Sequence, residues 1–241
     1  MFIKRKQSTS SEKEYSWQQI LKDLSGDNGV DSAADAAEML DKAADESHIS
    51  DLQKLALSSD LFVSEIAAIK LVELQGVKEL PLLLKALDNG MQLGHDCDGL
   101  VSAISSELEM NTSEAAPIVV DLLKSDNANE RANAAWAYGF IEDAVQIEPL
   151  LELASDEYST VRAEVASALS SFDTDPRAVD TLIQLLNDAD EQVRISAIAS
   201  LGYLGDKKTI PVLEKITKED TSENVQRFIK DALNRLKYHQ K

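Results

Sequence analysis

The stretch DPRAVDTLIQLLNDADEQVRISAIASLGYLGD, Asp175 to Asp206, decides how this chain folds. Both of its halves place apolar residues three and four positions apart, which predicts two short amphipathic helices. The apolar positions are Val179, Leu182, Ile183, Leu185 and Leu186, then Val193, Ala197, Ile198, Leu201 and Leu204. Asn187 to Asp190 is the turn between them. A hairpin this small cannot bury its apolar faces alone, so the stretch predicts further copies stacked beside it.

The same register recurs along the chain. Four anchor dipeptides lie 31 or 32 positions apart, and these are Glu130-Arg131, Val161-Arg162, Val193-Arg194 and Val225-Gln226. Each anchor follows an acidic turn, and the prolines fall in or just before the first helix of a unit. Self-similarity at such a period is typical of repeat solenoids. The sequence therefore predicts an all-α protein, an α-solenoid of about six to seven helical hairpins.

With this pattern the chain resembles the HEAT-repeat superfamily, in particular its short bacterial form. The residues that carry the resemblance are Asp190, Val193, Arg194, Ala197, Leu201, Gly202 and Gly205, with weaker matches at Asp156, Val161, Arg162, Ala166 and Leu169 and at Arg131, Ala134, Ala135 and Gly139. The resemblance covers about residues 46–237 and implies a HEAT-like superhelix. It implies little about activity, because these residues build the stack and the fold hosts many functions.

We expect residues 16–241 to form a single solenoid domain. Residues 1–15 are basic and polar with few apolar side chains, which predicts a disordered tail. Residues 16–45 are expected to cap the N-terminal end and residues 207–241 the C-terminal end, since a terminal repeat needs a polar outer face. The stretch 88–99 holds three glycines and is expected to be an irregular loop, a common place for function.

The charge of the chain, −19, is unevenly distributed. Residues 23–206 contain 10 basic and 36 acidic residues, whereas residues 207–241 contain 9 basic and 5 acidic ones. Such an acidic body repels phosphate backbones, so we expect a basic protein partner and no nucleic acid. No run approaches the roughly 18 apolar residues of a membrane span, and no apolar stretch follows the basic start. We therefore expect a cytoplasmic protein that does not bind membranes and is a monomer when free.

The resemblance implies that the second helix of each hairpin lines the concave face. There Trp136 and Phe140 lie one helical turn apart, and Tyr203 occupies the repeat position of Phe140. Aromatic residues rimmed by acids are typical of protein interfaces. The expected partner-binding residues are Asn133, Trp136, Phe140, Glu164 and Tyr203 on this face and Glu130, Asp156, Glu157, Asp190 and Glu191 at the turns.

Small residues on the same face are expected to leave room for a partner, and they include Ala137, Ala168 and Ser200. Trp136 has a second interpretation, as core between repeats. The anchor arginines Arg131, Arg162 and Arg194 share one register, which predicts a structural ladder with neighbouring turn acids rather than a ligand site.

The sequence predicts no catalytic or metal site. His48, His95 and His239 are not followed by Glu, and none lies four residues from another His. Helical metal-ligand pairs are therefore absent, which argues against resemblance to the HEAT-repeat di-iron hydroxylases. No Gly-rich phosphate loop or nucleophile elbow occurs. We expect no cofactor.

The leading interpretation is a non-catalytic solenoid that binds a basic protein through its acidic concave and turn surface. One version is an immunity protein or inhibitor of a basic toxin such as a nuclease, since acidic complementarity would speed association. A HEAT-like lyase or chaperone for a small chromophore or cofactor stays open, by analogy with the phycobilin lyases. So does an assembly adaptor scaffold whose basic C-terminal helix contacts acid on another chain.

Overall fold

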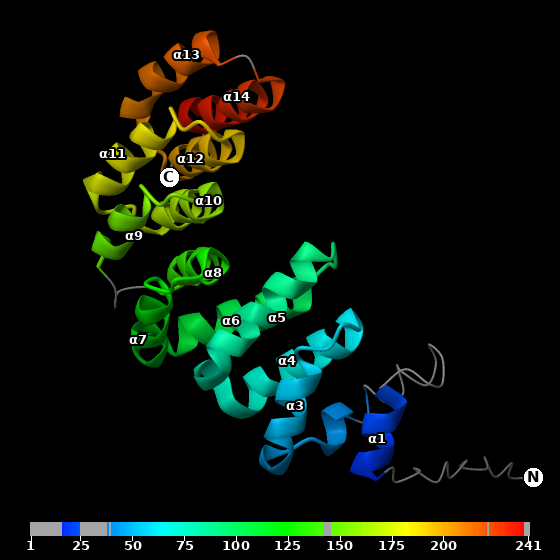
Figure 1. Ribbon diagram of the computed structural model, residues 1–241. Helices are drawn as coiled ribbons and strands as arrows, with labels where there is room; N and C mark the ends of the chain where they lie inside the picture. The colour runs from blue at the N-terminus through cyan, green and yellow to red at the C-terminus, as the bar shows by residue number, and fades with distance from the viewer. Residues whose placement is uncertain (1–15, 25–37, 39, 142–145, 221, 239–241) are drawn as a thin grey trace, which may run out of the picture.

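A computed structural model describes residues 16–24, 38, 40–141, 146–220 and 222–238. These residues form helices and no strand, and the helices stack into one curved, elongated body (Figure 1). This architecture confirms the predicted α-solenoid. The tail predicted at 1–15 lies outside the described residues, as do residues 25–37 and 39 of the predicted cap at 16–45.

The N-terminal half of the stack consists of α1 (Trp17–Leu24), the 3-10 turn η1 (Glu46–His48), α3 (Ile49–Leu55), α4 (Leu61–Gln75), η2 (Gly76–Glu79), α5 (Leu80–Gln92), α6 (Asp98–Met110) and α7 (Thr112–Leu122). The C-terminal half consists of α8 (Ala128–Tyr138), α9 (Glu148–Leu153), α10 (Ser159–Ala168), η3 (Leu169–Ser171), α11 (Pro176–Leu185), α12 (Glu191–Leu204), η4 (Lys207–Thr209), α13 (Ile210–Glu219) and α14 (Glu223–Tyr238). Aspartate or asparagine side chains accept hydrogen bonds from backbone N–H groups at the first turns of several helices, as Asp190 does at the start of α12.

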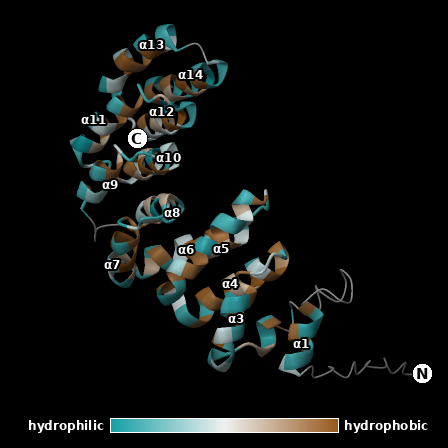
Figure 2. Ribbon diagram, in the orientation of Figure 1, coloured by the Kyte–Doolittle hydropathy of each residue, from teal (hydrophilic) through white to brown (hydrophobic). Residues whose placement is uncertain are grey.

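The second helices α8, α10, α12 and α14 pack side by side as an inner layer, and α9, α11 and α13 lie outside them (Figure 1). Apolar residues run in stripes along these helices (Figure 2). The inner helices approach closely: a Cβ added to Gly139 would lie 3.3 Å from the Cα of Ala168, and one on Gly202 would lie 3.0 Å from the Cα of Ala232.

This close packing corrects one expectation. Ala137, Ala168 and Ser200 do not leave room for a partner, because they are buried between neighbouring helices. The Ser200 hydroxyl donates to the carbonyl oxygen of Ala166 at 2.8 Å. These three small residues therefore set the helix spacing, whereas Ser167, Ser171, Ser196 and Ala199 stay accessible.

The predicted irregular loop at 88–99 is also corrected. Helix α5 continues to Gln92 and α6 begins at Asp98, so the connection is only 93–97. Gly90 lies inside α5, and a Cβ there would come 2.5 Å from the Cys97 sulfur. The glycine thus lets the connection fold back onto α5. In the same connection, His95 Nε2 lies 3.0 Å from Glu65 Oε2 of the neighbouring helix α4.

The regular inner layer changes at α8. On one side α8 packs against α10, but on the other it packs against α5, while α6 packs against α4.

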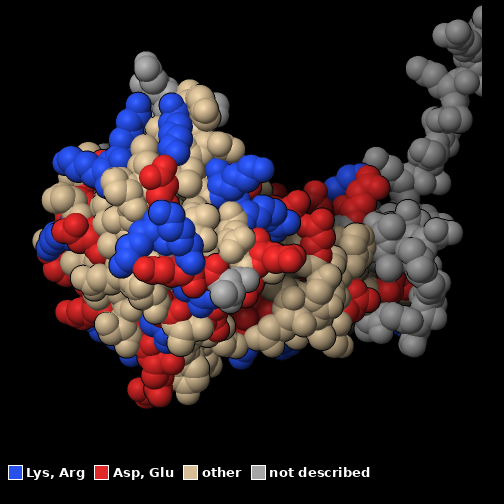
Figure 3. Space-filling view, turned by 90° about the horizontal axis from the view of Figure 1, so that it is seen from above, with Lys and Arg blue, Asp and Glu red and all other residues tan. Residues whose placement is uncertain are grey.

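Charge also changes along the stack: seen from its C-terminal end, Lys and Arg side chains gather on the surface (Figure 3). None of the described helices has the length and apolar character needed to cross a membrane.

Candidate functional site

The anchor arginines hold consecutive repeats together. Each donates from Nε to an Oδ2 of the next turn, and the pairs are Arg131–Asp156, Arg162–Asp188 and Arg194–Asp220 at 2.8, 2.7 and 2.7 Å. Nη1 of Arg162 also donates to the carbonyl oxygen of Asp156 at 2.8 Å, and the other two arginines make equivalent bonds. We call these pairs the Arg–Asp ladder. It confirms the structural role predicted for the three arginines.

The ladder removes some acids from the surface. Hydrogen bonds from Arg162 lower the pKa of Asp188 and outweigh its burial. For Asp156, burial raises the pKa, but bonds from Arg131 and from the Tyr158 N–H leave it below its usual value. The Asp156 side chain is only 7% exposed and its carboxylate is occupied. Asp156 therefore does not belong to an open partner-binding surface.

Asp190 also has a local role, since it accepts the Gln192 N–H at 2.9 Å at the start of α12. The remaining turn acids are exposed. Glu130 accepts from the Ser125 hydroxyl at 2.6 Å, and Glu191 accepts from the amide of Asn224 at 3.1 Å. Glu157 is exposed as well. These three glutamates form the part of the expected acidic edge that solvent can reach.

We define the inner surface as the side chains at four equivalent repeat positions along α8, α10 and α12, the last position lying just after α8 and in η3. They are Asn129, Asn133, Trp136 and Phe140, then Thr160, Glu164, Ser167 and Ser171, then Gln192, Ser196, Ala199 and Tyr203. The columns are adjacent: the Ser167 hydroxyl donates to that of Ser196 at 3.4 Å. Among these residues Glu164 is the only charged one. These positions thus carry a single charge, and the exposed acids of the same helices, Glu130 and Glu191, lie in the first turns instead, so the acidic concave face expected from the sequence is acidic mainly at its edge.

The aromatic side chains of this inner surface lie at the C-terminal ends of α8 and α12. The rings of Trp136 and Phe140 meet edge to face, with centroids 4.9 Å apart and planes at 61°. Both are half-buried and pack against the core, so each shows only part of its ring to solvent. Tyr203, at the equivalent repeat position to Phe140, is 62% exposed. Trp136 therefore packs against the core, as its second interpretation expects, while part of its ring stays accessible.

Glu164 is the most unusual residue of the inner surface. Its side chain is half-buried, and burial raises its pKa. Within the described residues it has no hydrogen bond and no ion pair. A desolvated carboxylate without a partner is unfavourable, and the ladder aspartates avoid this by binding arginine. A cation arriving at Glu164 would supply the missing partner.

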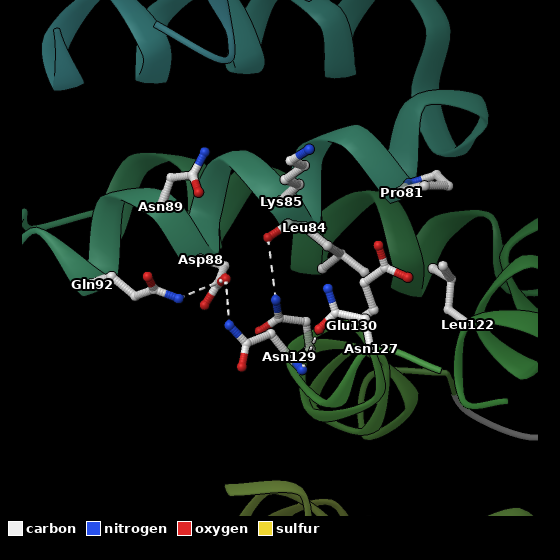
Figure 4. A pocket seen from close by; sticks show the side chains of 11 residues that line it. Pro81, Leu84, Lys85, Asp88, Asn89, Gln92, Leu122, Asn127, Asn129 and Glu130 are labelled. Carbon is white, nitrogen blue, oxygen red and sulfur yellow. Dashed lines mark hydrogen bonds between the residues drawn. The ribbon is translucent and has the colours of Figure 1, made fainter. Parts of the chain in front are cut away.

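A polar crevice of about 260 Å³ borders the inner surface where α8 meets α5. Its lining is Pro81, Leu84, Lys85, Asp88, Asn89, Gln92, Leu122, Asn127, Asn129, Glu130 and Asn133. Asp88 accepts from Gln92 and Asn129, at 2.9 and 3.2 Å (Figure 4). Asn133 donates to the carbonyl oxygen of Leu84 at 3.4 Å. The expected residues Glu130 and Asn133 therefore face this crevice.

The sequence analysis does not find the α5 side of the crevice, because it predicts a loop at 88–99 where the structure continues the helix to Gln92. Asp88, Asn89 and Gln92 have the spacing of one helical face, which continues the face of Lys85. That spacing was the available signal. The glycine at position 90 obscured it.

Comparison with known proteins agrees with the repeated pairs of helices. The family described as HEAT repeats matches residues 99–170 and 155–234. The chain belongs to the HEAT-repeat family. The relatives include protein YibA of Escherichia coli, which is 33% identical over 96 residues, 39% of this chain and 34% of YibA. The HEAT-repeat chain thus spans about a third of that relative.

Other relatives of this HEAT-repeat protein carry enzyme names. A deoxyhypusine hydroxylase of Schizosaccharomyces pombe is 27% identical over 130 residues, 52% of this chain and 41% of the hydroxylase. The complex of CpcE and CpcF of phycocyanin lyase from Nostoc sp. is a structural neighbour, with a TM-score of 0.51 and 20% identity over 65% of this chain and 98% of that one. That likeness shows the fold alone. In the part of the chain that the structure describes, no three His, Cys, Asp or Glu side chains are grouped to hold a metal.

Proposed function

We propose that this HEAT-repeat protein is a non-catalytic binding module whose inner surface takes a protein segment with a basic side chain. Glu164 carries this proposal. It is the one charge in a surface of amides, hydroxyls and aromatic rings, and it lacks a partner of its own among the described residues. A lysine or arginine of the bound segment would pair with it in a partly desolvated site, where a charge-assisted hydrogen bond is strong.

The surroundings of Glu164 favour a peptide over an isolated cation. Asn133 and Ser196 occupy the equivalent positions of the neighbouring repeats, and such side chains donate and accept hydrogen bonds as a peptide backbone requires. Trp136 and Phe140 supply apolar area beside them. We expect the residue next to the basic one in the bound segment to be apolar and to contact these two rings.

The net charge of −19 supports the same class of partner, because an acidic body attracts basic proteins from a distance. The exposed glutamates at the turns, Glu130, Glu157 and Glu191, would act at this stage. An inhibitor or immunity protein for a basic toxin would use both features. In that role the module acts by covering the partner's surface.

The test starts from a random peptide library displayed on phage and selected on the protein at about 50 mM salt. We expect the selected peptides to share a Lys or Arg next to an aromatic or aliphatic residue. In fluorescence anisotropy, E164Q should weaken a selected peptide by about tenfold or more, because a hydrogen bond between charged groups is lost. E152Q, at an exposed glutamate of the outer helix α9, is the matched control and should change the affinity less than about twofold.

Two results would reject the proposal. One is selection of peptides without a basic residue, and the other is equal affinity of a selected peptide for E164Q and the unchanged protein. Native mass spectrometry of the purified protein adds a check on the alternative function. A bound pigment or cofactor that W136A releases would favour the lyase or chaperone interpretation instead.

A further inference from the structure

Helix α14, the last of the described helices, presents a row of basic side chains to solvent. The basic residues are Arg227, Lys230 and Lys237; with the neutral Asn234 they follow one another at intervals of three and four, so all four share one face of the helix. All four are exposed. From Arg227 to Lys237 the row spans about 15 Å. We call this row the α14 basic face.

The arginines of α14 differ from those of the body. Arg131, Arg162, Arg177 and Arg194 each bind an aspartate or glutamate. By contrast, Arg227, Lys230 and Arg235 have no carboxylate within ion-pair distance in the described part of the chain. At the ladder position α14 carries Gln226. The row is therefore not required to join repeats.

A shallow groove of about 620 Å³ runs along this face between α13 and α14. Besides the basic residues, its lining includes Thr217 of α13 and Leu233, Asn234 and Tyr238 of α14, and one carboxylate, Glu223, at the start of α14. Tyr238 is 78% exposed. The groove thus places apolar side chains among the basic ones. One basic residue is already engaged, since Lys237 Nζ lies 2.8 Å from Glu214 Oε1.

We propose that the α14 basic face binds an acidic, amphipathic segment of another protein. Charge complementarity argues for the acids of this segment, and the exposed Tyr238 and half-buried Leu233 argue for its apolar residues. A long phosphate polymer fits less well, because beyond this short row it would meet the acidic body, where residues 23–206 hold 36 acidic and 10 basic residues. The inference is independent of the function proposed for the inner surface. It makes the protein a two-sided adaptor, with partners of opposite charge on its two surfaces.

The test uses a labelled synthetic helix-forming peptide with Glu and Leu at alternating three- and four-residue spacings, and the same peptide with Gln in place of Glu. Fluorescence anisotropy at about 50 mM salt measures its affinity for the full chain. The variant R227E/K230E reverses the α14 basic face. The control K207E/K208E changes the net charge equally, at exposed lysines of the same end in η4.

We expect R227E/K230E to weaken binding by about tenfold or more and K207E/K208E by less than about threefold, since only the first pair faces the groove. The Gln peptide should not bind, and E164Q should bind the Glu peptide normally. Circular dichroism establishes that both variants keep their helices. Equal losses in the two charge-reversal variants, or binding of the Gln peptide, would overturn the proposal.

Two further measurements identify other occupants. A single-stranded DNA oligomer of similar length that binds more tightly than the Glu peptide, and depends on Arg227 and Lys230, would assign the face to polyanions. Self-association in analytical ultracentrifugation that R227E/K230E abolishes would assign it to a second copy of the chain. Either result would refute an acidic protein segment as the ligand.

Discussion

The substitution R162A tests whether the Arg–Asp ladder, rather than apolar packing alone, holds the repeats in register. The Arg162 guanidinium donates to both carboxylate oxygens of Asp188, at 2.7 and 2.8 Å, and to the carbonyl oxygens of Asp156 and Glu157, at 2.8 and 3.2 Å. The side chains of Arg162 and Asp188 are 16% and 10% exposed. The alanine variant therefore leaves a nearly buried carboxylate and two carbonyl groups without their donor.

Removing one member of a buried pair costs about 3–5 kcal/mol, because the other charge stays buried. Some water reaches Asp188, which favours the lower end of this range, about 3 kcal/mol. Arg177 provides a matched control. It pairs with Glu148 and Asp175, but the Arg177 and Glu148 side chains are each 50% exposed. The free energy of unfolding should therefore fall much less in R177A than in R162A, because solvent screens the exposed pair.

Urea titrations followed by circular dichroism give both free energies of unfolding, provided that the slopes of the transitions agree. The double variant R162A/D188N should lose less stability than the sum of the single changes, because Asn removes the stranded charge and still accepts the Asp190 N–H. A loss in R162A no larger than that in R177A would refute the reasoning. The ladder would then follow the stacking without stabilising it.

Three further predictions concern the packing and titration of the same repeats. G202A should lower the free energy of unfolding by about 1–2 kcal/mol, measured in urea, since the new methyl group would meet Ala232 across the α12–α14 contact. Y138F should cost about 1 kcal/mol in the same assay, because it removes the 2.7 Å bond to the carbonyl oxygen of Gln146. The folded-state pKa of Asp188 is lowered, so its stabilising effect should be complete above about pH 5 and be lost as the pH falls below about 4. Urea midpoints against pH should show this loss in the unchanged protein and a smaller one in R162A.

The sequence predicted the repeats well because the residues that recur at a fixed period are the ones that join and pack the repeats. Arg162 and Asp188 occupy positions that recur from repeat to repeat, so a pairing between an anchor arginine and a neighbouring turn acid could be predicted from the register alone. The inner surface was harder. The sequence showed which side chains belong to the second helices, but the spacing of those helices depends on contacts such as that of Gly202 with Ala232, which bury the small residues.

The distribution of charge could be predicted only in part. Counting acids along the chain does not show which of them are neutralised, and Asp156 illustrates this because its carboxylate lies under Arg131. Nor did the count reveal that Glu164 stands alone on the inner surface. Whether an acid has a partner in another repeat depends on how the repeats stack in three dimensions, and a count along the chain does not contain that information.

This separation predicts two kinetic roles for acids that the sequence placed in one group. Glu157 and Glu191 are exposed at the turns, where a charge acts mainly through its long-range field, so E157Q/E191Q should slow association of the selected basic peptide at about 50 mM salt. Glu164 is half-buried and would touch the peptide, so E164Q should speed dissociation instead. Stopped-flow fluorescence separates the two rates, and about 300 mM salt should erase the first effect while leaving most of the second. If E157Q/E191Q left the association rate unchanged at low salt, the turn acids would have no steering role and the acidity of the body would serve solubility alone.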